Sequence, residues 1–243
     1  MPTTKISPPR LKALLRSLLP GPAALLCLLL AFGPAAPAAA ETLSGKLVLV
    51  EGGKVQASRE SRNSVIWWQP KAPVKVQAPA TPFEMTTVRK EFLPRVLAVP
   101  AGSRVRFPNQ DPILHNVFSV SGENRFDLGL YKQGEAKEAH LRQAGIVNVF
   151  CNVHHSMVGY IAVLDTPFYT SADAEGLFKL EGLPAGPGSL TLWQERADPK
   201  TIELVLPQKG SPLEVRLEVT KARVPPHRNK FGQPYERQRG KAY

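Results

Sequence analysis

A chain of 243 residues with a formal net charge of +11 would ordinarily suggest a polyanionic partner, but its basic residues gather at the two ends. The first forty residues hold four basic and no acidic side chains, and residues 221–243 hold seven basic side chains against Glu236, so the body between them is nearly neutral. This distribution argues against a nucleic-acid-binding face. It instead predicts a basic, disordered tail over 221–243, which could attract an acidic partner or an anionic membrane surface.

Residues 1–40 have the pattern of a secretory signal peptide. Basic residues between Lys5 and Arg16 precede an apolar run at 23–32, and three alanines ending at Ala40 supply a cleavage site. The apolar run is too short and too interrupted by proline and glycine to cross a membrane, although a retained N-terminal anchor is the alternative. We therefore expect cleavage near Ala40, no membrane span in the mature chain, and a periplasmic or secreted location.

Loss of the signal peptide removes Cys27 and leaves Cys151 as the only cysteine of the mature chain. No internal disulfide is then possible, and an unpaired thiol in an oxidising compartment requires an explanation. Metal ligation is one explanation, and a buried, inert cysteine is the other.

Three further segments follow along the chain. Residues 41–80 contain two apolar runs and then a proline-rich linker or edge strand, so we place a domain boundary near Ala80. Residues 81–166 contain short apolar runs separated by turn signals, at the spacing of a β-sandwich. Residues 167–220 contain short strands with Gly-Pro turns, too few for a closed fold alone. No long amphipathic period is present, although 135–143 could form a short helix, so we predict an all-β protein of two sandwich modules.

The stretch GIVNVFCNVHHSMVGYIAVLD, from Gly145 to Asp165, carries the chemistry of the chain. Cys151, His154 and Met157 are spaced three residues apart between two apolar runs, and their thiolate, imidazole and thioether are ligands that copper prefers. A second imidazole is expected from His115 in DPILHNVFSV. Asn116 beside it is expected to join the two ligand loops through side-chain hydrogen bonds. The plainer interpretations are a core methionine at Met157 and an ordinary turn asparagine at Asn116.

The stretches PNQDPILHNVFSV and GIVNVFCNVHHSMVGYIAVLD resemble the two ligand segments of plastocyanin-like cupredoxins, and the Cys-x2-His-x2-Met spacing resembles the short loop of amicyanins. The likeness covers about 82–166. It implies a Greek-key cupredoxin sandwich, one type 1 (blue) copper ion bound by His115, Cys151, His154 and Met157, and a role in electron transfer. The chain is also similar to periplasmic cupredoxin-like proteins of methylamine utilisation.

His155 departs from this family, which usually has proline after the loop histidine. Adjacent side chains tend to diverge, so we expect His155 to lie beside the ion at the surface, with direct ligation as the alternative. A ligating His155 could produce a red or green copper centre or a zinc site, although the thioether of Met157 is a poor zinc ligand. His140 and His227 lie among polar residues and are expected to be solvated.

The run DAEGLFKLEGLPAGPGSLTL resembles carboxypeptidase regulatory-like, transthyretin-type sandwich modules, and LSGKLVLV and VIWW resemble the first strands of that family. This resemblance suggests that residues 41–77 and 167–220 together form one sandwich into which the cupredoxin is inserted. Each part alone has too few strands to bury a core.

The sequence therefore predicts a periplasmic blue-copper protein that passes single electrons between periplasmic redox proteins and has no nucleic-acid partner. An enzyme is not expected, because the chain contains no nucleophile elbow, HExxH, phosphate loop or paired carboxylate motif. Two alternatives stay open: a copper carrier or sensor without rapid redox chemistry, and a mononuclear copper or zinc enzyme with an open coordination position.

Overall fold

The computed structural model of this chain describes residues 40–56 and 58–235, so the predicted signal peptide lies outside the described residues. Within them the structure is all-β, as predicted, with two short 3-10 helices, η1 (Ser58–Asn63) and η2 (Gly122–Asn124). No helix among the described residues is long and apolar enough to cross a membrane.

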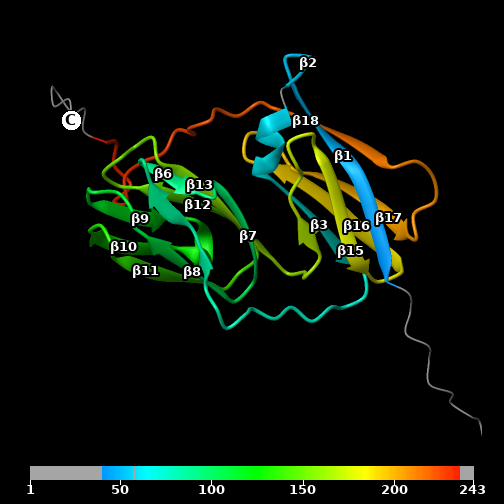
Figure 1. The fold of residues 1–243 in the computed structure, drawn as a ribbon, viewed down its shortest axis with the longest axis horizontal. Helices are drawn as coiled ribbons and strands as arrows, with labels where there is room; N and C mark the ends of the chain where they lie inside the picture. The colour runs from blue at the N-terminus through cyan, green and yellow to red at the C-terminus, as the bar shows by residue number, and fades with distance from the viewer. Residues whose placement is uncertain (1–39, 57, 236–243) are drawn as a thin grey trace, which may run out of the picture. The chain divides into compact units, whose positions relative to one another are not determined.

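The middle of the chain forms the central sandwich (Figure 1). Its larger sheet has five strands in the order β10-β9-β12-β13-β7, and its smaller sheet has the order β11-β8-β4. The bounds of the larger sheet are β10 (Phe126–Tyr131), β9 (His115–Ser119), β12 (Gly145–Cys151), β13 (Val158–Leu164) and β7 (Val96–Pro100); those of the smaller are β11 (Ala136–Leu141), β8 (Ser103–Pro108) and β4 (Phe83–Glu84).

The core of the central sandwich is built from alternate residues of its strands. Val105 and Phe107 of β8 face Val147 and Val149 of β12, and all four are almost fully buried. Alternation at a period of two is what places these side chains on one face of each sheet. The predicted short helix at 135–143 is wrong, because β11 occupies most of this segment and pairs with β8 along six residues. A strand here covers the edge of β8, which local propensity does not record.

A separate two-stranded hairpin, β5 (Thr86–Val88) and β6 (Glu91–Leu93), lies against the central sandwich. The backbone N–H of Gln110 donates to the carbonyl of Thr87 (2.9 Å), and the hydroxyl of Thr87 lies 3.1 Å from Oδ1 of Asn109. The hairpin is thereby attached to the loop that precedes His115.

The outer sandwich combines strands from both ends of the described chain. One sheet has the order β15-β1-β18, with β2 also paired to β1, and the other has the order β14-β3-β16-β17. The bounds are β1 (Glu41–Glu51), β2 (Lys54–Val55), β3 (Ser64–Pro70), β14 (Tyr169–Thr170), β15 (Leu177–Leu183), β16 (Gly186–Gln194), β17 (Lys200–Leu206) and β18 (Leu213–Glu218). β1 and β3 thus pair with strands that follow the central sandwich in the chain. The predicted boundary at 80 falls between β3 and β4, and the one at 166 falls between β13 and β14. Independent folding of the two modules stays a prediction.

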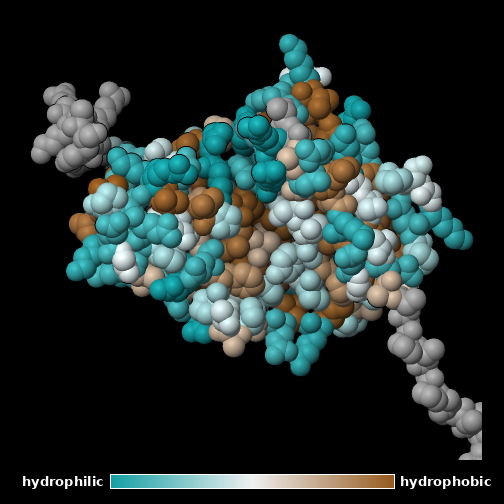
Figure 2. Space-filling view, in the orientation of Figure 1, coloured by the Kyte–Doolittle hydropathy of each residue, from teal (hydrophilic) through white to brown (hydrophobic). Residues whose placement is uncertain are grey.

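A third buried cluster joins the two sandwiches. Trp193 of β16 packs edge-on against Tyr160 of β13, with ring centroids 5.7 Å apart. Arg95 donates to the Glu195 carboxylate (2.5 Å), to the carbonyl of Val158 (3.1 Å) and to the carbonyl of Arg223 (2.6 Å). The carboxylate side chain is only 3% exposed, so this guanidinium compensates a buried charge at the junction. Elsewhere the face seen in Figure 2 is mostly hydrophilic, with apolar side chains exposed towards its middle.

Candidate metal centre

The ends of two neighbouring strands bring the predicted ligands together. β9 begins at His115 and β12 ends at Cys151, and the two strands pair antiparallel with Cys151 opposite Val117. The chain then turns through a short loop before β13. In this loop the N–H of Met157 donates to the carbonyl of His154 (3.0 Å), and the N–H of Cys151 donates to the carbonyl of Met157 (3.3 Å). The tight turn places His154 beside the end of β12.

Three donor atoms converge at this point. Sγ of Cys151 lies 3.6 Å from Nδ1 of His115 and 3.7 Å from Nδ1 of His154, and the two Nδ1 atoms are 3.3 Å apart. Cys151 and His115 are fully buried, whereas His154 is half-buried. Among the described residues this is the one group of three or more His, Cys, Asp or Glu side chains whose donors are close enough for one ion.

The separations fit a trigonal metal ion. An ion in the plane of its ligands, about 2.0 Å from each nitrogen and about 2.3 Å from sulfur, needs nitrogens roughly 3.5 Å apart and nitrogen–sulfur separations of roughly 3.7 Å. The observed distances of 3.3, 3.6 and 3.7 Å lie close to these values. Two imidazoles and one thiolate in a trigonal set are the donors of a blue-copper site. Met157 is 1% exposed and packs in the same core cluster as Cys151, which places a thioether in the vicinity of the set.

Asp111 orients the first histidine, a role that the sequence analysis did not assign. Nε2 of His115 lies 2.9 Å from Oδ2 of Asp111, and the same carboxylate accepts the backbone N–H groups of Arg89 (2.5 Å) and Lys90 (2.8 Å). A carboxylate at Nε2 accepts its N–H and leaves the lone pair of Nδ1 directed at the donor cluster. The sequence contains this aspartate four positions before His115, in QDPILH. Nothing in the local sequence showed that the loop would bring the carboxylate to the imidazole.

Burial sets the protonation of the donors. Burial lowers the pKa of His115 despite the opposing carboxylate of Asp111, and it lowers the pKa of His154 as well. Burial raises the pKa of the Cys151 thiol, although three backbone N–H groups around the sulfur oppose this shift. Both imidazoles are therefore ready to coordinate at neutral pH, and a metal ion must displace the thiol proton when it binds.

Asn116 links the ligand segments through its main chain, and its side chain points elsewhere. Its carbonyl accepts the N–H of Asn152 (2.9 Å), beside Cys151, whereas its Nδ2 donates to Oδ1 of Asp127 (2.7 Å). Successive side chains of a strand face opposite sides, so a residue next to His115 cannot direct its amide to the same place. The expected side-chain link therefore differs from the observed main-chain link.

The C-terminal strap, residues 221–235, contacts the outer sandwich through Lys221 and the central sandwich through His227 and Lys230, in contrast to the predicted solvated tail. Residues 236–243 lie outside the described residues. His227 stacks on Phe150, with ring centroids 4.2 Å apart and an interplanar angle of 8°. Its Nδ1 lies 3.0 Å from the carbonyl of Pro225. The prediction that His227 is solvated is wrong, because composition does not show that an aromatic partner is available. His140, by contrast, is exposed.

The strap also reaches the metal-ligand loop. The N–H of Lys230 donates to Oδ1 of Asn152 (3.1 Å), and its ammonium group pairs with Asp127 (2.7 Å). At the end of the strap the Tyr235 ring lies over the His155 ring, with centroids 3.6 Å apart. Burial raises the pKa of Tyr235 to about 12. His155 thus contacts the strap and lies outside the donor cluster.

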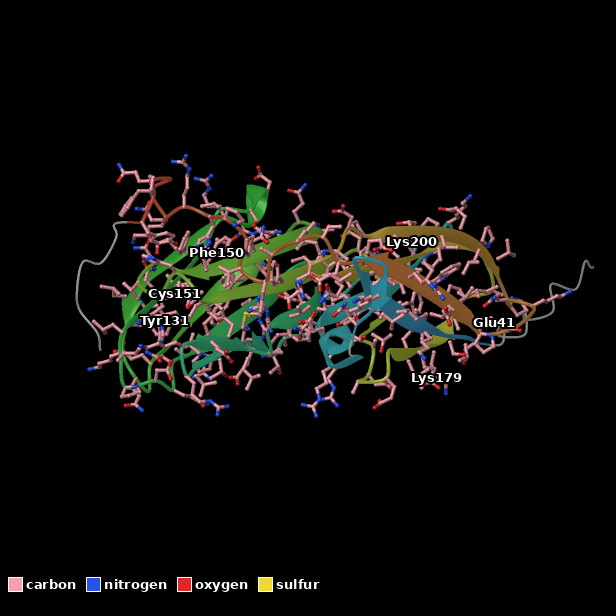
Figure 3. All side chains as sticks on the ribbon, turned by 90° about the horizontal axis from the view of Figure 1, so that it is seen from above. Glu41, Tyr131, Phe150, Cys151, Lys179 and Lys200 are labelled. Carbon is pink, nitrogen blue, oxygen red and sulfur yellow. The ribbon has the colours of Figure 1, made fainter. Side chains whose placement is uncertain are left out.

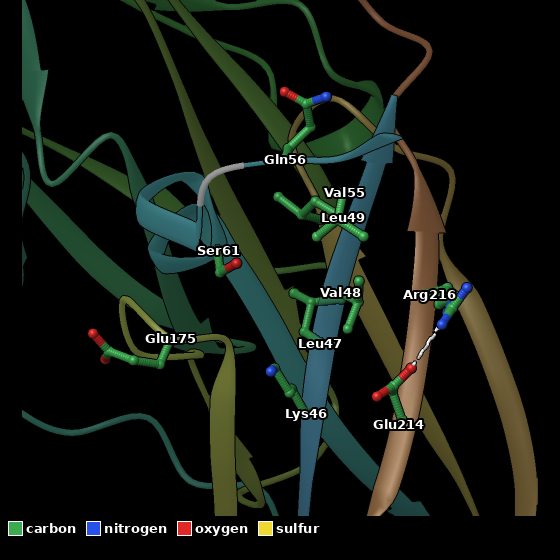
Figure 4. A pocket seen from close by; sticks show the side chains of 10 residues that line it. All are labelled: Lys46, Leu47, Val48, Leu49, Val55, Gln56, Ser61, Glu175, Glu214 and Arg216. Carbon is green, nitrogen blue, oxygen red and sulfur yellow. Dashed lines mark hydrogen bonds and ion pairs between the residues drawn. The ribbon is translucent and has the colours of Figure 1, made fainter. Parts of the chain in front are cut away.

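An open groove lies elsewhere, on the outer sandwich (Figure 4). Its volume is about 560 Å³, and apolar side chains of β1 line it together with the Arg216–Glu214 ion pair (3.2 Å). No cysteine or histidine lines this groove. The metal-binding chemistry of the described chain therefore lies in the central sandwich, where Figure 3 labels Cys151 near Tyr131 and far from Lys179 of the outer sandwich.

No family model matches this chain, and no curated protein matches it in sequence. Among solved structures, a purple cupredoxin from Nitrosopumilus maritimus is 20% identical with a TM-score of 0.31, over 34% of this chain and 99% of that one. A reduced variant of amicyanin is 20% identical with a TM-score of 0.32, over 40% of this chain and 99% of that one. A copper-containing nitrite reductase from Thermus scotoductus is 27% identical with a TM-score of 0.33, over 38% of this chain and only 25% of that one. These partial likenesses carry no argument about the site, whose interpretation rests on its own geometry.

Proposed function

We propose that this protein is a periplasmic electron carrier that binds one copper ion through His115, Cys151 and His154, with Met157 as a weak fourth ligand. The observation that carries this proposal is the convergence of two Nδ1 atoms and one Sγ atom at 3.3–3.7 Å from one another. Copper in such a set changes between Cu(I) and Cu(II) with little change of geometry, which permits fast single-electron exchange.

The protein's own residues prepare this site for electron exchange. Asp111 holds the His115 ring in one orientation, and pairing of β12 with β9 and β13 fixes Cys151 at a strand end. Burial of Cys151 and His115 keeps water away from two donors, whereas the half-buried His154 lies closer to the surface. We infer that electrons enter and leave by way of His154.

The alternatives are less well supported by the arrangement of side chains. An enzyme would need a further donor or an open position, but His155, the adjacent residue in the loop, contacts the Tyr235 ring and lies outside the cluster. A zinc site would make poor use of the buried thioether of Met157. The periplasmic location, the protein redox partners, the copper-carrier alternative, and the resemblances to carboxypeptidase regulatory-like modules and to proteins of methylamine utilisation all stay predictions.

Copper loading of the mature protein tests the proposal. Addition of Cu(II) should produce an intense blue absorption and an EPR signal with narrow copper hyperfine splitting, and the copper should be reduced and reoxidised reversibly. Cys151→Ser should abolish the blue colour because it removes the thiolate, whereas the matched loop variant His155→Ala should retain it. A wild-type protein that stays colourless, or that retains zinc in preference to copper, would refute the proposal.

A further inference from the structure

The tip of the β5–β6 hairpin has an unusual composition for its backbone conformation. Arg89 and Lys90 occupy the two central positions between β5 and β6, with φ angles of 53° and 58°. Two-residue hairpins with positive φ at both positions strongly favour Asn-Gly, because glycine and asparagine enter this region with the least strain. Two long basic side chains at this turn are therefore held there against local preference, which directs attention to a function for them.

Asp111 is the group that holds the turn. Its two carboxylate oxygens accept the N–H groups of Arg89 and Lys90, and Oδ2 also contacts Nε2 of His115. One buried carboxylate therefore fixes both the basic turn and the ring of a proposed copper ligand. Asp111 alone thus links the turn to His115, although the turn precedes Asp111 by more than twenty positions in the sequence.

The β5–β6 turn presents two exposed basic side chains, followed by the exposed Glu91, and exposed apolar side chains precede the two histidines. The side chains of Arg89 and Lys90 are exposed, and the positive charge of Lys90 contributes to the lowered pKa of both His115 and His154. Leu114 and Val153, which precede these two histidines, are 50% and 37% exposed. Apolar side chains bordered by positive charge form a surface suited to a partner with a negative rim.

We propose that the Arg89–Lys90 turn docks an acidic surface of a protein redox partner over the metal centre. The inference rests on the proposed electron-carrier function and names the chemistry of its partner. Both basic side chains are exposed, and the leucine and valine that precede the two histidines are exposed as well, which suits a broad protein surface better than a small anion. Opposite charges on the two surfaces would raise the rate of encounter and orient the partner towards His154.

The test compares the Arg89→Gln/Lys90→Gln variant with the matched variant Lys54→Gln/Lys200→Gln. The control loses the same charge from exposed lysines of β2 and β17, on the outer sandwich. Stopped-flow measurement at low ionic strength would follow reduction of the Cu(II) protein by hydroquinone flavodoxin, an acidic protein donor, and by hexacyanoferrate(II), a small anionic donor. Reduced cytochrome c of basic surface serves as a donor of opposite charge.

We expect the Arg89→Gln/Lys90→Gln variant to react with flavodoxin about tenfold more slowly than the wild type, with the loss shrinking at high salt, because steering contributes roughly 10- to 1000-fold to such rates. The control should stay within about twofold of the wild type, and the rate with cytochrome c should not fall. An unchanged rate with flavodoxin, or an equal loss in the control, would overturn the proposal. A loss confined to hexacyanoferrate(II) would also overturn it, since the turn would then recognise a small anion.

Failure of the proposed function can be told apart from failure of this inference. A wild-type protein without blue colour would count against electron transfer before any rate is measured. Docking can then be tested by titrating the metal-free protein with oxidised flavodoxin and following backbone amide NMR shifts. Shifts centred on Arg89 and Lys90 would support the docking surface, and shifts centred elsewhere would refute it.

Discussion

Replacement of Asp111 by asparagine is the most informative single change in this structure. The carboxylate receives three hydrogen bonds: Oδ1 accepts from the N–H of Arg89, and Oδ2 accepts from both the N–H of Lys90 and Nε2 of His115. Asn retains one acceptor oxygen but presents an amide donor where Oδ2 stood. That donor would face two other donors, so Asp111→Asn loses two charge-assisted bonds and adds a repulsive contact.

The expected cost follows from these bonds. A hydrogen bond to a charged group contributes about 1.5–3 kcal/mol, so loss of two gives an upper range of about 3–6 kcal/mol, and we expect about 3 kcal/mol after local relaxation. The contact that holds the His115 ring with the Nδ1 lone pair towards the donor cluster would be lost as well. Loss of a group that orients a metal ligand typically lowers metal affinity about 10- to 100-fold.

Asp173→Asn supplies a matched control. Asp173 also accepts two backbone N–H groups, from Glu175 (2.9 Å) and Leu177 (2.8 Å), but both bonds go to the same oxygen, Oδ1. Asparagine can keep both of them. Urea unfolding of the metal-free proteins and competition for Cu(I) with a chelator would measure stability and affinity. If Asp111→Asn unfolds at the same urea concentration and binds copper as tightly as Asp173→Asn, the assignment of Asp111 as the orienting group is refuted.

Two further predictions concern the strap and the junction of the sandwiches. Lys230→Met should speed hydrogen exchange in residues 224–235 about twofold, because it removes the partly exposed ion pair with Asp127 (2.7 Å), worth about 0.5 kcal/mol. Acid should weaken the same contact in the wild type. Burial opposes ionisation of Asp127, but hydrogen bonds from Lys230 and two other donors hold its pKa below 3.8. The stabilisation is therefore present above pH 3.8 and disappears as the pH falls through the lower native pKa. Exchange that is the same at pH 5 and pH 3, after correction for intrinsic rates, would contradict this. Arg95→Met should cost about 3–5 kcal/mol, measured by thermal unfolding, because it leaves the Glu195 carboxylate buried without its partner. The double variant with Glu195→Gln should recover part of that loss, and no recovery would show that the pair is not the source of the cost.

The ligand loop could be predicted from sequence because its chemistry is local. Cys151, His154 and Met157 are separated by three residues each and connect two strands, so a single turn must bring them close. The partner His115 could be inferred from the order of the chain, because in an antiparallel pair the start of one strand lies beside the end of its neighbour. The all-β class followed from short apolar runs separated by turn signals and from the absence of a long amphipathic period.

Other contacts depend on groups far apart in the chain. Asp111 acts as an orienting group because it contacts both the β5–β6 hairpin and the first residue of β9. Neither the sequence of the hairpin turn nor that around Asp111 predicts this contact. The strap was predicted to be solvated from its composition, yet Lys230 finds Asp127 at a separation of 103 residues. The composition of a segment indicates the average free-energy cost of burying it. It does not show whether the folded protein offers a surface with which that segment can pair.

For this protein, the sequence by itself determined which donor atoms are available, their spacing in the loop and the strands that carry them. The tertiary structure decided which nitrogen of each imidazole faces the thiolate, which carboxylate holds His115, and that His155 contacts Tyr235 outside the donor cluster. The physical reason is that residue type and spacing control contacts within a turn. The direction of a side chain is set by packing against elements that arrive from elsewhere in the chain.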